Sequence, residues 1–112
     1  MIIKPENMRT EIEDAGDLGK KLNLQFLLDG QVKNVRTFAK ATLEIGAEVK
    51  FHVHNGESET YYILSGCGTY NDNGKEVTVS SGDITFTADG EGHGLRNNGT
   101  EPLEFIALIV YE

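Results

Sequence analysis

The 112-residue sequence predicts an all-β fold, a small antiparallel sandwich or barrel. Apolar side chains recur at every second position, and helical periodicity is weak throughout. Turn-forming pairs such as Asp29-Gly30, Ser65-Gly66 and Ser81-Gly82 separate these runs. The runs recur about every 8 to 12 residues, which is the spacing of strands in antiparallel sandwiches and barrels.

Two strands are predicted in the first half of the chain. Residues 22–28 alternate apolar with polar side chains and end at Asp29-Gly30. Residues 35–45 predict a half-buried strand with small side chains in its middle. One face of that strand carries Val35, Thr37, Ala39, Ala41, Leu43 and Ile45. Residues 13–21 have the composition of a loop, and residues 1–4 are a candidate strand, paired in this subunit or with another.

The second half contains the clearest strand signals. An apolar and aromatic run covers residues 61–64, and residues 84–87 follow a Ser-Gly turn. Residues 68–70 and 77–79 flank Asn-Asp-Asn-Gly at 71–74, which predicts a hairpin. Residues 105–111 are almost continuously apolar and rich in β-formers. We therefore expect this last strand to be central and buried.

Composition narrows the class of protein. Ten basic against 18 acidic residues give a net charge of −8, which argues against binding a nucleic-acid backbone or an anionic membrane surface. The longest apolar stretch, residues 105–111, is far below the roughly 20 residues of a membrane-spanning helix. Cys67 is the single cysteine and has no partner for an internal disulfide. Since the start of the sequence also lacks a secretory hydrophobic region, we expect a single cytoplasmic domain.

The three histidines lie close together in the sequence. His52 and His54 are two residues apart, so in a strand both imidazoles project from one face, about 6.6 to 7 Å apart along the chain. Two such nitrogens can converge on one metal ion. Glu59 follows the turn-forming Asn55-Gly56, and His93 would complete a set of three nitrogens and one oxygen. The alternative is that each histidine is an ordinary surface or core residue.

The spacing around these residues resembles two signatures of the cupin superfamily. The first runs from Gly46 through His52, His54 and Glu59 to Gly66, and the second contains Gly82, Gly90, His93 and Asn97. Ala88 stands where the second signature usually has proline, so nine of ten signature positions are met. Only 15 residues separate the two motifs, as in compact conserved-barrel or cupin-2 proteins. The missing proline puts the rigidity of that turn in doubt.

The resemblance implies a double-stranded β-helix, or jelly roll, that holds one divalent metal in its mouth. It assigns His52, His54, Glu59 and His93 as ligands, with residues 31–112 as the barrel and residues 1–30 as an N-terminal arm and first strands associated with a homodimer. Three imidazoles and one carboxylate suit Mn, Fe, Co, Ni or Zn and leave two octahedral positions open for a substrate. A structural zinc site would instead be closed and commonly contain cysteines.

Other side chains are candidates for the pocket. Tyr61 shares strand parity with Glu59, so we expect it to point into the barrel, either as a proton donor or as an aromatic core residue. The glycines at 90, 92 and 94 either leave an open entrance beside His93 or only permit tight turning. The candidate carboxylate clamps are Arg36, Lys40 and Arg96. Parity predicts that Arg36 and Lys40 lie on the exterior.

Three hypotheses for function follow. The first is a metal-dependent oxidoreductase or lyase that acts on a small oxygen-rich molecule chelating the ion, by dioxygenase, decarboxylase or isomerase chemistry. The second is a non-catalytic, metal-dependent domain that binds or senses a sugar or organic acid. The third is a structural interaction module. We favour the first because the ligand set implied by the resemblance is complete.

Overall fold

The computed structural model describes residues 1–112 as ten strands and one short 3-10 helix. No helix in it has the length and hydropathy that crossing a membrane requires. The elements are η1 (Pro5–Asn7), β1 (Thr10–Asp14), β2 (Lys21–Leu28), β3 (Val35–Leu43), β4 (Glu48–Val53), β5 (Glu57–Ser65), β6 (Cys67–Asp72), β7 (Lys75–Ser80), β8 (Ile84–Thr87), β9 (Gly92–Arg96) and β10 (Leu103–Tyr111). The predicted all-β fold is therefore confirmed.

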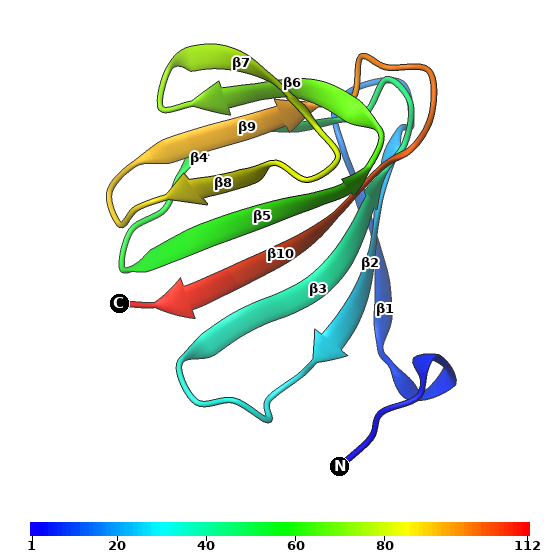
Figure 1. The fold of residues 1–112 in the computed structure, drawn as a ribbon, viewed down its shortest axis with the longest axis vertical. Helices are drawn as coiled ribbons and strands as arrows, with labels where there is room; N and C mark the ends of the chain where they lie inside the picture. Colours follow the sequence, from blue (N-terminus) through cyan, green and yellow to red (C-terminus); the bar gives the residue numbers. More distant parts are fainter.

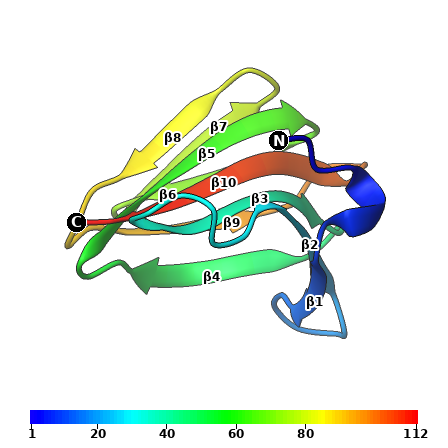
Figure 2. The same ribbon diagram turned by 90° about the horizontal axis from the view of Figure 1, so that it is seen from below.

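The strands form two antiparallel sheets. The larger sheet has six strands in the order β1-β2-β3-β10-β5-β8, and the smaller has four in the order β4-β9-β6-β7. Figure 1 shows the two sheets as the lower and upper layers of a jelly roll. In both views the 3-10 helix and the C-terminus lie at opposite ends of the molecule (Figure 2).

The core lies between the two sheets. β10 occupies the predicted central position, between β3 and β5, and its alternate side chains from Leu103 to Ile109 are buried. On β5, Glu59, Tyr61 and Ile63 share the inward face, as strand parity predicts. A strand that buries an apolar side chain at every second position gains about 1.5–3 kcal/mol for each one. Glu59 is the polar residue among these three inward-facing side chains of β5, so it places a carboxylate inside the apolar core.

The N-terminal region differs from the prediction. Residues 13–21 are not one loop, because Glu13 and Asp14 belong to β1 and Lys21 begins β2. All five residues of β1 are exposed. Because the strand buries neither face, its sequence has no alternation of apolar and polar residues from which a strand could be predicted. Backbone pairing with β2 defines it instead. Residues 1–4 form no strand within this chain.

β3 also departs from the predicted pattern, at both of its ends. Ile45 lies beyond the strand, which ends at Leu43, and is 45% exposed. Val35 pairs with Val110 and Thr37 pairs with Ile109, so Arg36 is an extra residue in the ladder between β3 and β10. This is a β-bulge, which re-aims side chains by breaking the two-residue alternation.

Two turns, at residues 73–74 and 88–91, bear on predictions made from the sequence. The predicted hairpin is confirmed, since β6 and β7 are joined at Asn73-Gly74, both with positive φ as a type I′ turn requires. At the position of the missing proline, the backbone N–H of Ala88 donates to the Glu91 carboxylate at 3.0 Å, and the N–H of Glu91 donates to the Ala88 carbonyl at 3.0 Å. These reciprocal bonds fix the turn, and proline could not make the first of them.

Candidate metal centre

Four side chains from three strands meet at one point inside the barrel. His52 lies on β4, His54 directly follows β4, Glu59 lies on β5 and His93 on β9. Strand pairing places His52 directly opposite His93. One donor atom from each residue lies within 4.8 Å of all the others. The structure therefore brings together every residue that the sequence predicted for this cluster.

The donor atoms face one another at short range. The three Nε2 atoms are 3.0 Å apart for His52 and His54, 3.1 Å for His54 and His93, and 3.2 Å for His93 and His52. Glu59 Oε1 lies 2.9 Å from His54 Nε2 and 2.8 Å from His93 Nε2. His93 is fully buried, and His54 and Glu59 are 6% and 5% exposed. His52 is only half-buried, so the cluster is reached from the His52 side.

The opposite nitrogen of each imidazole has a hydrogen-bond acceptor. His52 Nδ1 donates to the backbone carbonyl of Lys50 at 2.7 Å, and His54 Nδ1 donates to Glu57 Oε1 at 2.8 Å. His93 Nδ1 is hydrogen-bonded to the Tyr70 hydroxyl at 2.8 Å, and that hydroxyl is hydrogen-bonded to Thr87 Oγ1 at 2.8 Å. A carbonyl or a carboxylate accepts but cannot donate, so these partners fix the proton on Nδ1 of His52 and His54.

This arrangement fits a divalent cation. With the protons of His52 and His54 held on Nδ1, their Nε2 lone pairs face the Glu59 carboxylate and the Nε2 atom of His93. A cation at their centre would satisfy all four donors at once. Burial lowers the pKa of His52, and the neighbouring His93 and His54 lower it further, which favours the neutral imidazole that a metal needs. The group could hold one metal ion.

Tyr61 lies beside the cluster on the inward face of β5. Its ring is 5.0 Å from the His93 ring and 4.5 Å from the Phe105 ring, centroid to centroid. Burial raises the pKa of the Tyr61 hydroxyl well above its usual value of 10, and the negative charge of Glu59 raises it further. Tyr61 is therefore a neutral phenol at physiological pH and can donate a hydrogen bond.

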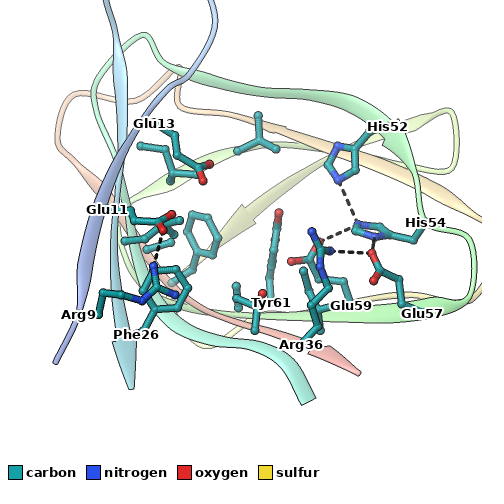
Figure 3. A pocket seen from close by; sticks show the side chains of 18 of the residues that line it. Arg9, Glu11, Glu13, Phe26, Arg36, His52, His54, Glu57, Glu59 and Tyr61 are labelled. Atoms are coloured by element: carbon teal, nitrogen blue, oxygen red, sulfur yellow. Dashed lines mark hydrogen bonds and ion pairs between the residues drawn. The ribbon is translucent and has the colours of Figure 1, made fainter. Parts of the chain in front are cut away.

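The cluster opens into a cavity of about 540 Å³ between the two sheets. Figure 3 shows His52, His54, Glu57 and Glu59 at one end of it and Arg9, Glu11 and Phe26 at the other. Aliphatic side chains also line it, namely Leu22, Leu24, Val49, Ala107 and Ile109. The cavity thus combines the polar His/Glu cluster with apolar wall residues, a common composition for small-molecule sites.

The structure decides between the two alternatives for the glycines. An open entrance beside His93 is excluded, because His93 is fully buried and Gly92 and Gly94 lie within β9, whereas Gly90 has a positive φ in the turn before that strand. A Cβ atom at Gly94 would lie 3.0 Å from the backbone nitrogen of Phe51, so these glycines allow β4 to pack closely. Arg36 is exposed, as parity predicts, but the prediction missed that its side chain also lines the cavity, where the bulge places it.

The other two candidates for binding a carboxylate, Lys40 and Arg96, do not line the cavity. Lys40 approaches Glu104 on β10, and Arg96 lies 3.6 Å from Glu76 on β7, both outside the cavity. The sequence analysis missed three residues that support the cluster. Glu57 is hydrogen-bonded to His54 Nδ1, Tyr70 is hydrogen-bonded to His93 Nδ1, and Thr87 is hydrogen-bonded to Tyr70. Glu57 could have been suspected, since it is an acidic residue between His54 and Glu59. Nothing in the local sequence marks Tyr70 or Thr87.

Comparison with known proteins gives three informative similarities. An oxalate-binding protein of Thermotoga maritima is 48% identical over 75 residues, 67% of this chain and 62% of that protein. The crystal structure of a predicted oxalate decarboxylase from Thermotoga maritima superposes with a TM-score of 0.89 at 35% identity and covers 100% of both chains. Mannose-1-phosphate guanylyltransferase of Escherichia coli is 32% identical over 69 residues, 62% of this chain but 15% of that enzyme.

The shared segment is thus 62% of the length of the oxalate-binding protein and 15% of the length of the guanylyltransferase, so this chain spans only part of each curated relative. The model of the cupin-domain family matches residues 39–111, which include all four donors of the cluster. With the jelly-roll topology and the converging histidines, this match establishes that the chain belongs to the cupin superfamily.

Proposed function

We propose that this cupin binds one divalent transition metal through His52, His54, Glu59 and His93, and acts on a small carboxylate that chelates the metal. Oxalate is the first candidate, because two Thermotoga maritima proteins with similar sequence or structure are named for oxalate. The observation that carries the proposal is the convergence of three Nε2 atoms whose partner nitrogens are all engaged. A bound ion would supply Lewis-acid stabilisation of charge on the carboxylate oxygens.

Among the three predicted reaction types, decarboxylation has support from the relatives. Converting hydrogen oxalate to carbon dioxide and formate breaks the C–C bond and forms one C–H bond, so a proton must reach the carbon. Tyr61 is the side chain suited to donate it, because it lines the cavity next to Glu59 and His93 and remains protonated.

Two measurements on metal-loaded protein test the proposal. Calorimetric titration with oxalate should show saturable binding, and incubation with oxalate should release formate and carbon dioxide in equal amounts. Both signals should disappear in His54→Ala, which removes a ligand that is 6% exposed and should leave the barrel folded by circular dichroism. Oxalate that fails to bind protein loaded with each of Mn, Fe, Co, Ni and Zn would refute the carboxylate assignment.

A second candidate, metal-dependent binding without turnover, has its own support. Tyr61 is the side chain beside the cluster that we propose as proton donor, and its raised pKa makes it a weak acid. Glu57, the other acidic group near the cluster, already accepts bonds from His54 and Arg36. This candidate predicts that oxalate binds but yields no formate over a long incubation. Formate release at a rate proportional to protein concentration would exclude it.

The outer face of the larger sheet supports our expectation of a homodimer. Tyr62 and Ile84 pair across β5 and β8 on this face and are 46% and 69% exposed, and Phe86 on β8 is 59% exposed. Contiguous apolar surface of this kind marks interaction sites in soluble proteins. Light scattering should give twice the 12.3 kDa chain mass. Ile84→Glu should give the monomer mass, and Ile45→Glu, in a loop outside this face, should not.

A further inference from the structure

Arg36 occupies an unusual position in the cavity. It is the extra residue of the β-bulge between β3 and β10, and the bulge directs its side chain toward the metal end (Figure 3). Its Nη1 donates to Glu57 Oε1 at 2.8 Å, and the same oxygen accepts the Nδ1 proton of His54. Arg36 is therefore linked to a predicted metal ligand through one carboxylate.

Most hydrogen-bond donors of the Arg36 guanidinium have no partner. Only Nη1 has a hydrogen-bond partner, which leaves Nε and Nη2 free, and the side chain is 47% exposed. The second cation of the cavity, Arg9, is already committed, because it pairs with Asp29 and Glu11 and stacks over Phe26 at 3.8 Å. Of the two arginines that line the cavity, Arg36 is thus the one with nitrogens that have no partner, because all three guanidinium nitrogens of Arg9 are paired.

We propose that Arg36 forms an anion subsite next to the metal centre and selects dianionic carboxylates over monoanionic ones. This inference rests on the proposed function, since it concerns the second carboxylate of a ligand whose first carboxylate is bound at the metal. The planar guanidinium offers Nε and Nη2 in the geometry that matches a carboxylate. Arg36 keeps its bond to Glu57 in this arrangement, so Glu57 remains neutralised and does not repel the incoming dianion.

A purely structural role for Arg36 predicts a different pattern. If Arg36 only neutralised Glu57, its loss would act through His54 on the metal. Every ligand that binds the metal would then be weakened by a similar factor. A direct contact with the second carboxylate instead weakens only ligands that have one. The ratio of the two affinities therefore separates the two roles.

The experiment compares oxalate with glycolate, a monoanion of the same carbon number that also chelates through two oxygens. Dissociation constants are measured by calorimetry on Mn²⁺-loaded wild type, Arg36→Gln and Arg36→Lys, with metal content determined for each. Loss of a charge-assisted contact should raise the Kd of oxalate about 10- to 100-fold in Arg36→Gln. Glycolate should change less than about 3-fold. Arg36→Lys, which keeps the charge but not the fork, should fall between wild type and Arg36→Gln for oxalate.

The matched control is Arg96→Gln, since Arg96 has a similar exposure of 43% and pairs with Glu76 outside the cavity. It should leave both affinities unchanged. Equal weakening of oxalate and glycolate in Arg36→Gln, or no weakening of either, would overturn the subsite while the proposed function stands. If the wild type binds neither ligand, the proposed function fails and the subsite fails with it.

Discussion

Tyr70→Phe removes one oxygen atom from the buried chain of hydrogen bonds behind His93. In the wild type, the Tyr70 hydroxyl is hydrogen-bonded to His93 Nδ1 and to Thr87 Oγ1, each at 2.8 Å. Phenylalanine keeps the ring and its packing but leaves His93 Nδ1 and Thr87 Oγ1 without this partner. Because His93 is fully buried and Thr87 is 2% exposed, water does not replace the lost bonds.

The magnitude follows from the two groups left behind. A buried polar group that loses its partner costs about 1–3 kcal/mol. With two such groups, we expect the free energy of unfolding of the metal-free protein to fall by about 2–4 kcal/mol. The imidazole also loses the hydrogen bond that orients its ring, which should weaken metal binding by about 10- to 100-fold.

Urea denaturation and competition of the metal with a chelator measure the two effects. Tyr111→Phe is the matched control, because Tyr111 is 53% exposed at the end of β10 and its hydroxyl has no hydrogen-bond partner. The control should change stability by less than about 0.5 kcal/mol. If Tyr70→Phe holds the metal as tightly as Tyr111→Phe does, the hydrogen bond to His93 does not position that ligand and this reasoning is wrong.

Two further predictions concern other parts of the barrel. Tyr61→Phe should lower turnover of oxalate about 100-fold or more while metal content stays the same. In the wild type, the raised pKa of Tyr61 means that the phenol still carries its proton at pH 10, so the pH–rate profile should show no alkaline fall below that pH from this group. Gly68→Ala would place a Cβ 2.5 Å from the Arg96 carbonyl oxygen and 2.8 Å from Leu103 Cδ2. It should lower the free energy of unfolding by about 1–3 kcal/mol in urea denaturation, and a change below about 0.5 kcal/mol would contradict the close packing of β6 on β9.

The spacing of the histidines made the site predictable. His52 and His54 project together because side chains alternate along a strand, a regularity that holds wherever the strand forms. The same regularity puts Glu59, Tyr61 and Ile63 on one face of β5. The central position of β10 was also predictable, because a nearly continuous apolar run is typical of a strand that is buried on both faces.

The features that sequence analysis missed depend on pairing between distant strands. Tyr70 and Thr87 are 17 residues apart, and only the packing of β6 and β8 around His93 brings them together. The direction of Arg36 depends on one extra residue in β3, and alternation predicts the opposite face unless the bulge is known. β1 was not predicted as a strand, because its exposed and mostly charged side chains show no apolar periodicity.

The central claim is that His52, His54, Glu59 and His93 hold one metal ion. Elemental analysis of untagged protein tests it most directly, with His52→Ala and His93→Ala measured alongside the wild type. We predict about one equivalent of a divalent transition metal per chain in the wild type and a loss of most of it in both variants, because removing one of four donors opens the cluster. A wild type that retains no metal after production with each candidate ion, or variants that retain the full equivalent, would contradict the account.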